Sequence, residues 1–263
     1  MFYDYHTHTN FSDDSPAPIE TMIQEAINLG LAEVAITDHF DPAYPDPDFP
    51  FEINLPKYHE EMEAMCNKYE GVLPIIRGVE VGLQTDQMGR CQHVVDSYDY
   101  DFVIASFHCC MGEPLFNGHF FDNKDPSEYY EQFYMTVLNC LREYKRYSVL
   151  GHINVIDRYA PIIADRKIYM DIIDEILKII INGGKGIETN TSSYRYNMAS
   201  TIPQDFILKR YLELGGEIIT TGSDAHQPEH LAYNFGMTYE RLKSLGFRYI
   251  TTYREMKPSF IKL

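Results

Sequence analysis

The sequence contains no tryptophan, no long apolar run and few basic residues, and the last two absences exclude whole classes of protein. No segment approaches the roughly 20 apolar residues that a helix needs to cross a bilayer. The most apolar stretch, residues 172–181, is interrupted by Asp174, Glu175 and Lys178. The N-terminus lacks a basic segment followed by an apolar core, so we expect no secretory signal and a cytoplasmic protein.

Basic residues are scarce, with 22 Lys and Arg residues against 39 Asp and Glu residues and a formal net charge of −17. A surface of this charge repels nucleic acids and anionic membranes, because binding to either depends on Lys and Arg side chains that neutralise phosphates. We therefore expect neither a nucleic-acid nor a membrane partner. An acidic chain can still bind a phosphate group where metal ions supply positive charge locally.

Cysteine is also infrequent, with five residues and no Cys-x-x-Cys pair. The adjacent Cys109 and Cys110 would suit either a metal ligand pair or a strained disulfide. An odd number of cysteines in a protein without a secretory signal favours reduced thiols instead.

Short β-branched runs alternate along the chain with amphipathic segments, and this alternation predicts a parallel sheet flanked by helices. Seven predicted strands favour a closed or nearly closed barrel, an architecture that uses about 250 residues as one domain. An open doubly wound sheet is the alternative, although no Gly-x-Gly-x-x-Gly follows the first strand. The predicted strands are residues 3–6, 33–37, 73–81, 102–107, 148–151, 186–188 and 217–221, with a weak eighth at 248–252. The predicted helices are residues 18–29, 55–69, 127–144, 167–181, 203–214 and 229–244.

Histidines and acids gather where the predicted strands end. His6 and His8 close the first strand, and their spacing of two puts both imidazoles on one side of an extended chain. In a barrel of this kind the carboxyl ends of the strands converge on one face, so side chains from six strands meet there. The remaining strand-end residues are Asp38, His39, Glu80, His108, His152, Asp224 and His226.

Six strand-end histidines interleaved with acids predict a metal site. Imidazole and carboxylate ligands together suit Zn, Mn or Fe, and the set is too large for one ion. It fits three ions that share a bridging carboxylate, an arrangement that activates a hydroxide for displacement at phosphorus. We expect no ligand role for the other four histidines, although the loop residues His93 and His119 could reach a substrate. These four are His59, His93, His119 and His230.

The ordered set of motifs resembles the PHP (polymerase and histidinol phosphatase) superfamily, specifically its stand-alone histidinol-phosphate phosphatases. The resemblance implies a distorted, TIM-like (β/α)7 barrel, with residues 1–263 as one domain and a trinuclear metal centre. The matching blocks are HTHTNFSDDS from His6, TDH from Thr37, the GVE and SFH strand ends, GHIN, and GSDAH from Gly222.

The resemblance also distributes the ligands. His6, His8, Glu80 and Asp224 would hold the first ion, and Glu80 would bridge to a second. His108 and His152 would complete the second ion, and Asp14, His39 and His226 would hold the third. Several relatives have a histidine where this chain has Asp14, and Asp13 is the alternative ligand. We favour Asp14 because the Ser-x-Asp-Ser spacing fits better.

Two arginines follow strand ends on the same face, Arg158 six residues after His152 and Arg195 after the sixth strand. A guanidinium group matches the geometry of phosphate oxygens, and similar loops in these phosphatases carry phosphate-binding arginines. The resemblance therefore implies hydrolysis of a phosphate monoester by a metal-bridging hydroxide, with L-histidinol phosphate as the favoured substrate. The alternatives are another PHP phosphoesterase, acting on phosphotyrosine, nucleotides or sugar phosphates, and a non-catalytic PHP scaffold.

Residues 40–51 are rich in Pro and Asp and read as a loop above the same face. The composition fits a mobile lid and an ordered excursion equally well. Nothing in the sequence predicts the oligomeric state.

Overall fold

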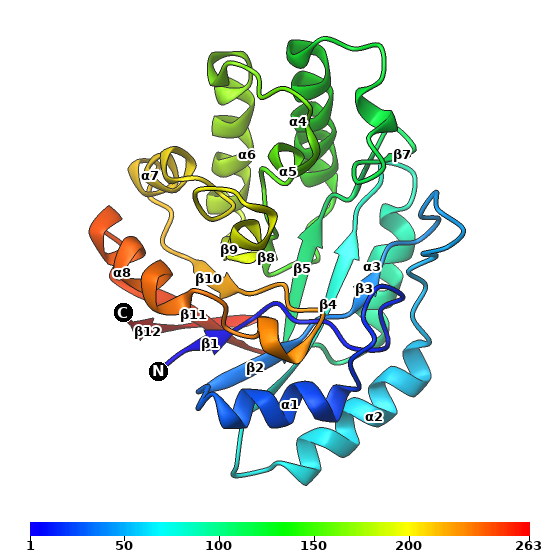
Figure 1. Cartoon of the computed structure of the whole chain (residues 1–263), viewed down its shortest axis with the longest axis vertical. Helices are drawn as coiled ribbons and strands as arrows, with labels where there is room; N and C mark the ends of the chain where they lie inside the picture. Colours follow the sequence, from blue (N-terminus) through cyan, green and yellow to red (C-terminus); the bar gives the residue numbers. More distant parts are fainter.

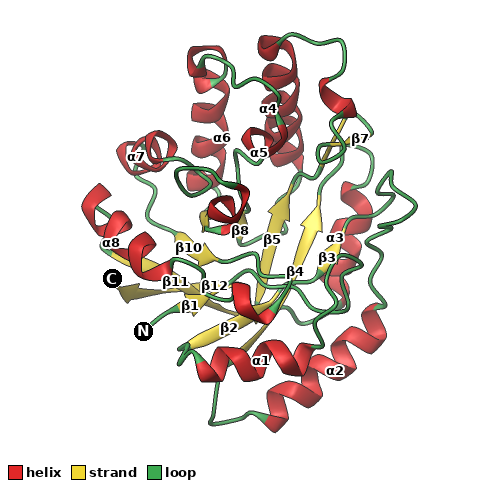
Figure 2. Cartoon of the chain, viewed as in Figure 1, coloured by secondary structure: helices red, strands yellow, loops and turns green.

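The computed structural model describes residues 1–263 and has a barrel of seven parallel strands with helices around it (Figures 1 and 2). A short strand, β3 (His39–Phe40), continues the line of β2, since both pair with β4 in one register: Val34 faces Ile75, and His39 faces Glu80. In barrel order the strands are β1 (Tyr3–Asp4), β2 (Glu33–Ile36), β4 (Ile75–Gly82), β5 (Phe102–Ser106), β8 (Val149–Leu150), β9 (Gly186–Asn190) and β10 (Ile219–Gly222).

The barrel closes between the segments that follow β1 and β10. The main-chain N–H of Tyr5 donates to the carbonyl of Thr221 at 2.9 Å, and Thr7 forms a parallel bridge with Ala225. This junction is short and irregular, which makes the barrel distorted. The prediction of seven parallel strands in a closed barrel is confirmed, and the open-sheet alternative is wrong.

The predicted eighth strand at 248–252 does not join the barrel. It forms β11 (Tyr249–Arg254), which pairs antiparallel with β12 (Lys257–Lys262) in a separate hairpin. Glu255 and Met256 both have positive φ, as a two-residue hairpin turn requires, so β11 finds its partner locally.

One end of the barrel interior is apolar and the other is polar. The apolar end is closed by the hairpin, because Tyr253 of β11 packs against Tyr5 and Phe102 and donates its N–H to the Tyr5 hydroxyl at 3.0 Å. At the carboxyl ends of the strands the buried side chains include Glu80, Ser106 and Glu188. The polar layer therefore lies where the sequence predicts the site.

The outer helices bury apolar stripes against the strands. In α6, Ile173, Ile176, Leu177 and Ile180 recur at helical spacing and are buried. None of the helices combines the length and apolar character of a bilayer-spanning segment. The helices are α1 (Ile19–Asn28), α2 (Leu55–Lys68), α3 (Met88–Ser97), α4 (Pro126–Glu143), α5 (Ile156–Tyr159), α6 (Met170–Asn182), α7 (Asp205–Glu213) and α8 (Phe235–Leu245).

The predicted helices differ from the structure in three places, the first of which is the unpredicted short helix α5. Helix α3 was not expected, because Gly89 and two valines lower its helix propensity, although Cys91, Val94 and Val95 form a buried stripe. The predicted helix at 229–244 begins only at Phe235, since a separate 3-10 helix (Pro228–His230) and the positive φ of Asn234 precede it.

Two of the smaller sequence features have clear structures. All five cysteines are free, as expected for reduced thiols. The loop of residues 40–51 folds back on itself, since the N–H of Asp41 donates to the carbonyl of Phe51 at 3.0 Å, and Phe40 bridges Glu52. Because the two ends of the loop are bonded to each other, the loop fits an ordered excursion.

Candidate metal centre

Glu80, near the end of β4, lies at the centre of the strand-end cluster and is fully buried. Its two oxygens face different imidazoles, which is the geometry of a bridging carboxylate. Oε2 lies 3.1 Å from His6 Nε2, 3.1 Å from His39 Nδ1 and 3.5 Å from His8 Nε2, whereas Oε1 lies 3.0 Å from His152 Nε2 and 3.3 Å from His108 Nε2.

Asp224 approaches the same cluster from the segment after β10, where its φ is +55°. Its Oδ1 lies 3.4 Å from His8 Nε2. Its Oδ2 accepts hydrogen bonds from Ser192 Oγ at 3.1 Å and from Asn190 Nδ2 at 3.3 Å. Ser192 and Asn190 therefore anchor one oxygen while the other faces the imidazoles.

Asp14 faces a second group of imidazoles, and its neighbour Asp13 does not. Asp14 Oδ2 lies 3.1 Å from His226 Nε2 and 3.7 Å from His39 Nε2. Asp13 Oδ2 instead accepts the N–H of Phe51 at 2.8 Å. This geometry favours Asp14 over Asp13 as the third-site acid, and the ligand assignment itself stays a prediction.

Asp38, although it ends a predicted strand, supports the loop after His8 and does not enter the cluster. Its Oδ1 accepts the N–H of Thr9 and the hydroxyl of Ser12, both at 2.6 Å. Ser12 Oγ in turn lies 3.3 Å from His8 Nδ1. Asp38 therefore helps to orient His8 indirectly, through Ser12.

Several buried polar atoms at the centre have no hydrogen-bond partner. Such atoms are rare in folded proteins, because an unsatisfied buried polar group is costly. Here the unpartnered atoms lie close together and are imidazole nitrogens and carboxylate oxygens, which are ligand atoms for Zn, Mn and Fe. The residues present fit bound metal ions. The unpartnered atoms at the centre include His6 Nε2, His8 Nε2, His39 Nδ1 and Glu80 Oε2.

Without a metal, the charges of this cluster are strongly coupled. Burial alone would raise the pKa of Glu80, but the rings of His6, His39 and His108 outweigh it and hold that pKa well below its usual range. Burial, together with the neighbouring imidazoles, lowers the pKa of His8 to about 3. The His8 ring is therefore neutral at pH 7, the form that binds a metal ion.

Two buried acids of this region are absent from the predicted set. Glu188 of β9 lies 2.6 Å from His6 Nδ1, and Asp41 lies 2.6 Å from His108 Nδ1. Glu188 falls at the end of a predicted strand, so the strand-end pattern could have found it. Asp41 follows His39 by two residues in an irregular loop, and no periodicity indicates it.

A cavity of about 530 Å³ opens over the cluster. Arg158 and Arg195 line it, as predicted, and His230 lies on its wall although the sequence suggested no role for it. His119 is exposed beside Asp122, and His59 stacks on Tyr98, so these two lie elsewhere. The rest of the wall is largely aromatic, from Tyr44, Phe49, Phe51, Phe116, Tyr159 and Tyr196.

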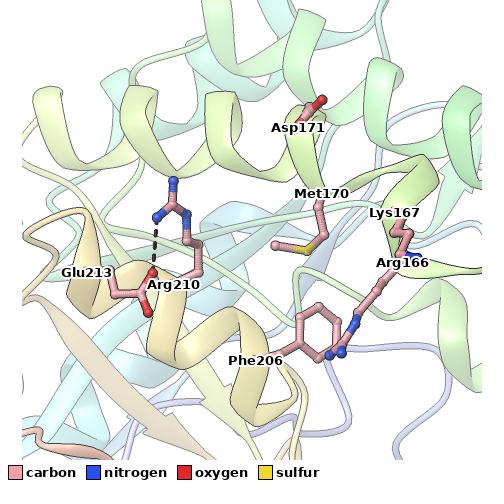
Figure 3. Close-up of a pocket in the computed structure, with 7 residues that line it drawn as sticks. All are labelled: Arg166, Lys167, Met170, Asp171, Phe206, Arg210 and Glu213. Carbon is pink, nitrogen blue, oxygen red and sulfur yellow. Dashed lines mark hydrogen bonds and ion pairs between the residues drawn. The ribbon is translucent and has the colours of Figure 1, made fainter.

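A second cavity, of about 390 Å³, lies outside the barrel between α6 and α7 (Figure 3). It contains none of the predicted site residues. Arg210, one of its cations, is paired with Glu213 at 3.0 Å and with Asp174 at 2.6 Å. The cavity over the strand ends is therefore the candidate site.

A parallel β/α barrel with imidazoles and carboxylates clustered at its strand ends defines a class of metal-binding barrel proteins. Within that class the chain belongs to the PHP domain family, whose model matches residues 4–192. This confirms the resemblance seen in the motifs.

The curated relatives and solved structures give more detail. The chain is 36% identical over 243 residues to a protein of Clostridium acetobutylicum named "Probable histidinol-phosphatase", covering 89% of this chain and 90% of that one. It is 29% identical to the histidinol-phosphatase of Lactococcus lactis subsp. lactis, over 97% of this chain and 95% of that one. A crystal structure of the Lactococcus histidinol phosphate phosphatase, complexed with zinc, L-histidinol and phosphate, matches with a TM-score of 0.89, 27% identity and 98% coverage of both chains.

Proposed function

We propose that this protein is a metal-dependent phosphatase that hydrolyses L-histidinol phosphate to L-histidinol and phosphate. One observation carries the proposal: the predicted ligands form one cluster at the strand ends, and six of them, two arginines and an aromatic wall line the cavity above it. The similarity to histidinol-phosphatases over nearly the whole chain supports the substrate. We also propose that residues 1–263 form one PHP domain and that the enzyme is cytoplasmic.

We assign three divalent ions to the cluster, of Zn, Mn or Fe. When bound, such ions supply positive charge that polarises phosphoryl oxygens and lowers the pKa of a nearby water molecule. The geometry supports this division because the two oxygens of Glu80 face different imidazoles and Asp14 faces His226 and Nε2 of His39, whose Nδ1 faces Glu80. The sets are His6, His8, Glu80 and Asp224; Glu80, His108 and His152; and Asp14, His39 and His226.

Arg158 is suited to hold the phosphate group. Its side chain is only 7% exposed, Nη2 donates to Ser192 Oγ, and Nε has no protein partner. The guanidinium carbon lies 4.3 Å from the centroid of the Tyr196 ring, which fixes its plane. Because Arg158 lines the cavity, an oriented guanidinium at this place can donate to a phosphate oxygen.

Arg195 binds the backbone beside Asp224, in addition to its proposed contact with phosphate. Its Nη1 donates to the carbonyl of Ser223 at 2.9 Å and its Nη2 to that of Asp224 at 2.8 Å. These bonds hold the backbone of Asp224 in its left-handed conformation. Arg195 therefore joins the arginine side of the cavity to the metal-facing acid.

Replacement of Arg158 by alanine is expected to lower kcat/KM by roughly 10- to 150-fold, because a hydrogen bond to a charged group contributes about 1.5–3 kcal/mol. Steady-state phosphate release measures this loss. Arg142→Ala, on the exposed face of α4, is the control and keeps wild-type kinetics. Unchanged kinetics in Arg158→Ala would remove Arg158 from the substrate site.

One pair of variants tests which of Asp14 and Asp13 is the metal ligand. Asp14→Asn is expected to bind about one metal ion fewer per chain, because an amide is a poor ligand for these ions. Asp13→Asn is expected to keep the wild-type metal content, since Asp13 contacts only the N–H of Phe51. Elemental analysis of both purified variants decides, and the reverse pattern would assign the ligand to Asp13.

The substrate itself is tested with a panel of monoesters after reconstitution with Zn²⁺ or Mn²⁺. We expect phosphate release from L-histidinol phosphate to exceed that from phosphotyrosine, p-nitrophenyl phosphate, nucleotides and sugar phosphates. A faster reaction with one of the others would assign the chain to that substrate. No turnover with any of them, in fully metallated protein, would favour the scaffold alternative.

A further inference from the structure

Glu188 and Asp41 lie outside the proposed ligand set, yet each holds the Nδ1 atom of a proposed ligand at 2.6 Å. Glu188 contacts His6 and Asp41 contacts His108, and both acids are at most 2% exposed. A carboxylate only accepts hydrogen bonds, so Nδ1 carries the proton in both rings. Nε2 of both rings faces Glu80, so a metal ion that displaces the Nε2 proton meets the lone pair of that nitrogen while Nδ1 keeps its hydrogen bond.

Neighbouring strands leave space for these two acids. A Cβ atom at Gly82, the last residue of β4, would overlap the carboxylate of Asp41. A Cβ atom at Gly222, the last residue of β10, would overlap Oε1 of Glu188. Each acid thus occupies the space of an absent side chain, so both contacts depend on glycine at a strand end.

We propose that Glu188 and Asp41 are positioning residues that fix the tautomers of His6 and His108, so that each Nε2 is available to a metal ion. The proposal rests on the proposed metal centre. Partners of this kind orient ligand rings in metalloproteins, and their loss typically weakens metal binding about 10- to 100-fold.

The two acids differ in what their second oxygen does. Oε2 of Glu188 accepts the main-chain N–H of His152 at 3.0 Å and Nδ2 of Asn190 at 3.2 Å. In Glu188→Gln the amide oxygen has to stay with these two donors, and the amide NH₂ then faces His6 Nδ1. That nitrogen has to accept, so the proton moves to Nε2 and blocks metal binding there.

Oδ1 of Asp41, in contrast, has no hydrogen-bond partner and lies 3.6 Å from Nδ1 of His39. In Asp41→Asn the amide oxygen can remain on His108 and the NH₂ group takes the Oδ1 position. The His108 tautomer is kept. The positioning role therefore predicts unequal effects of two equally conservative substitutions, whereas a general loss of buried negative charge predicts equal ones.

The experiment starts from metal-free protein. As Zn²⁺ is added back, its affinity is measured by competition with a chromophoric chelator. We expect binding about 10- to 100-fold weaker in Glu188→Gln and a smaller loss in Asp41→Asn. Nitrogen-15 NMR of the zinc-loaded protein is expected to show the His6 ring protonated on Nδ1 and bound through Nε2 in the wild type and in Asp41→Asn, and changed in Glu188→Gln only. The matched control is Asp101→Asn, a buried acid at the start of β5 that contacts Arg77 and the N–H of Glu255.

Gly222→Ala supplements Glu188→Gln, because the added methyl group would meet both the Glu188 carboxylate and Cβ of His6. Circular dichroism of the metal-free variants shows which of them fold. Wild-type zinc affinity in folded Glu188→Gln and Gly222→Ala, with unchanged tautomers, would overturn the positioning role and leave the proposed function intact. A wild-type protein that binds no zinc would instead overturn the metal centre on which both proposals rest.

Discussion

Glu80→Gln is expected to lower kcat/KM for phosphate release by at least about 10³-fold. The substitution keeps the size of the side chain and removes the negative charge that five imidazoles face. Metal ions contribute several kcal/mol to phosphoryl transfer, and a loss of about 4 kcal/mol corresponds to this factor. Glu80 is the acid that faces five imidazoles from the centre of the cluster, so its charge is the one most needed there.

The measurement is steady-state kinetics of the reconstituted variant, with metal content determined on the same sample. Glu131→Gln, on an exposed position of α4, is the matched control and keeps wild-type activity. Circular dichroism of the metal-free protein separates loss of the site from loss of the fold. Activity within about tenfold of wild type in a folded Glu80→Gln variant would show that the catalytic site lies elsewhere.

Removal of metal with a chelator is expected to abolish activity and to lower the thermal unfolding temperature, and Zn²⁺ or Mn²⁺ should restore both. Binding to the native state alone stabilises it by about 4 kcal/mol per site when the free ion is a thousandfold above its Kd. In a chain of this size each kcal/mol shifts the unfolding temperature by about 2–4 °C. One such site therefore raises it by roughly 10 °C.

Calorimetry of metal-free and metal-reconstituted protein tests the predicted change in the unfolding temperature. The shift should shrink in Glu80→Gln, because that variant loses the shared ligand. Calcium should restore neither activity nor stability, since it prefers sites built wholly from oxygen ligands. Full activity after verified removal of all metal would contradict the metal-dependent mechanism.

Much of the site was predictable because it depends on local periodicity combined with one rule of architecture. His6 and His8 share a side by their spacing, and parallel strands carry their carboxyl ends to one face. Helix α3 and the hairpin of β11 were harder. The residues of α3 have weak helix propensity, so the sequence did not indicate this helix. The apolar run of β11 indicates a strand, but it does not indicate whether that strand pairs in the barrel or with the next strand along the chain.

The acids around the ligands depend on contacts between distant parts of the chain. Glu188 meets His6 across 182 residues of sequence, and Asp41 meets His108 across 67. Asp13 and Asp14 are neighbours of the same type, and backbone torsion decides which one faces His226. The Ser-x-Asp-Ser spacing favours Asp14, and the fold determines its contact with His226.

The order of motifs was therefore enough to predict the barrel, the family and a set of candidate metal ligands, because strand ends converge on one face. Folding in three dimensions decided which carboxylate holds which imidazole and how the barrel closes. The reason is physical: a strand-end position sets the face on which a side chain lies, whereas the partner of each polar atom depends on every segment that packs against it.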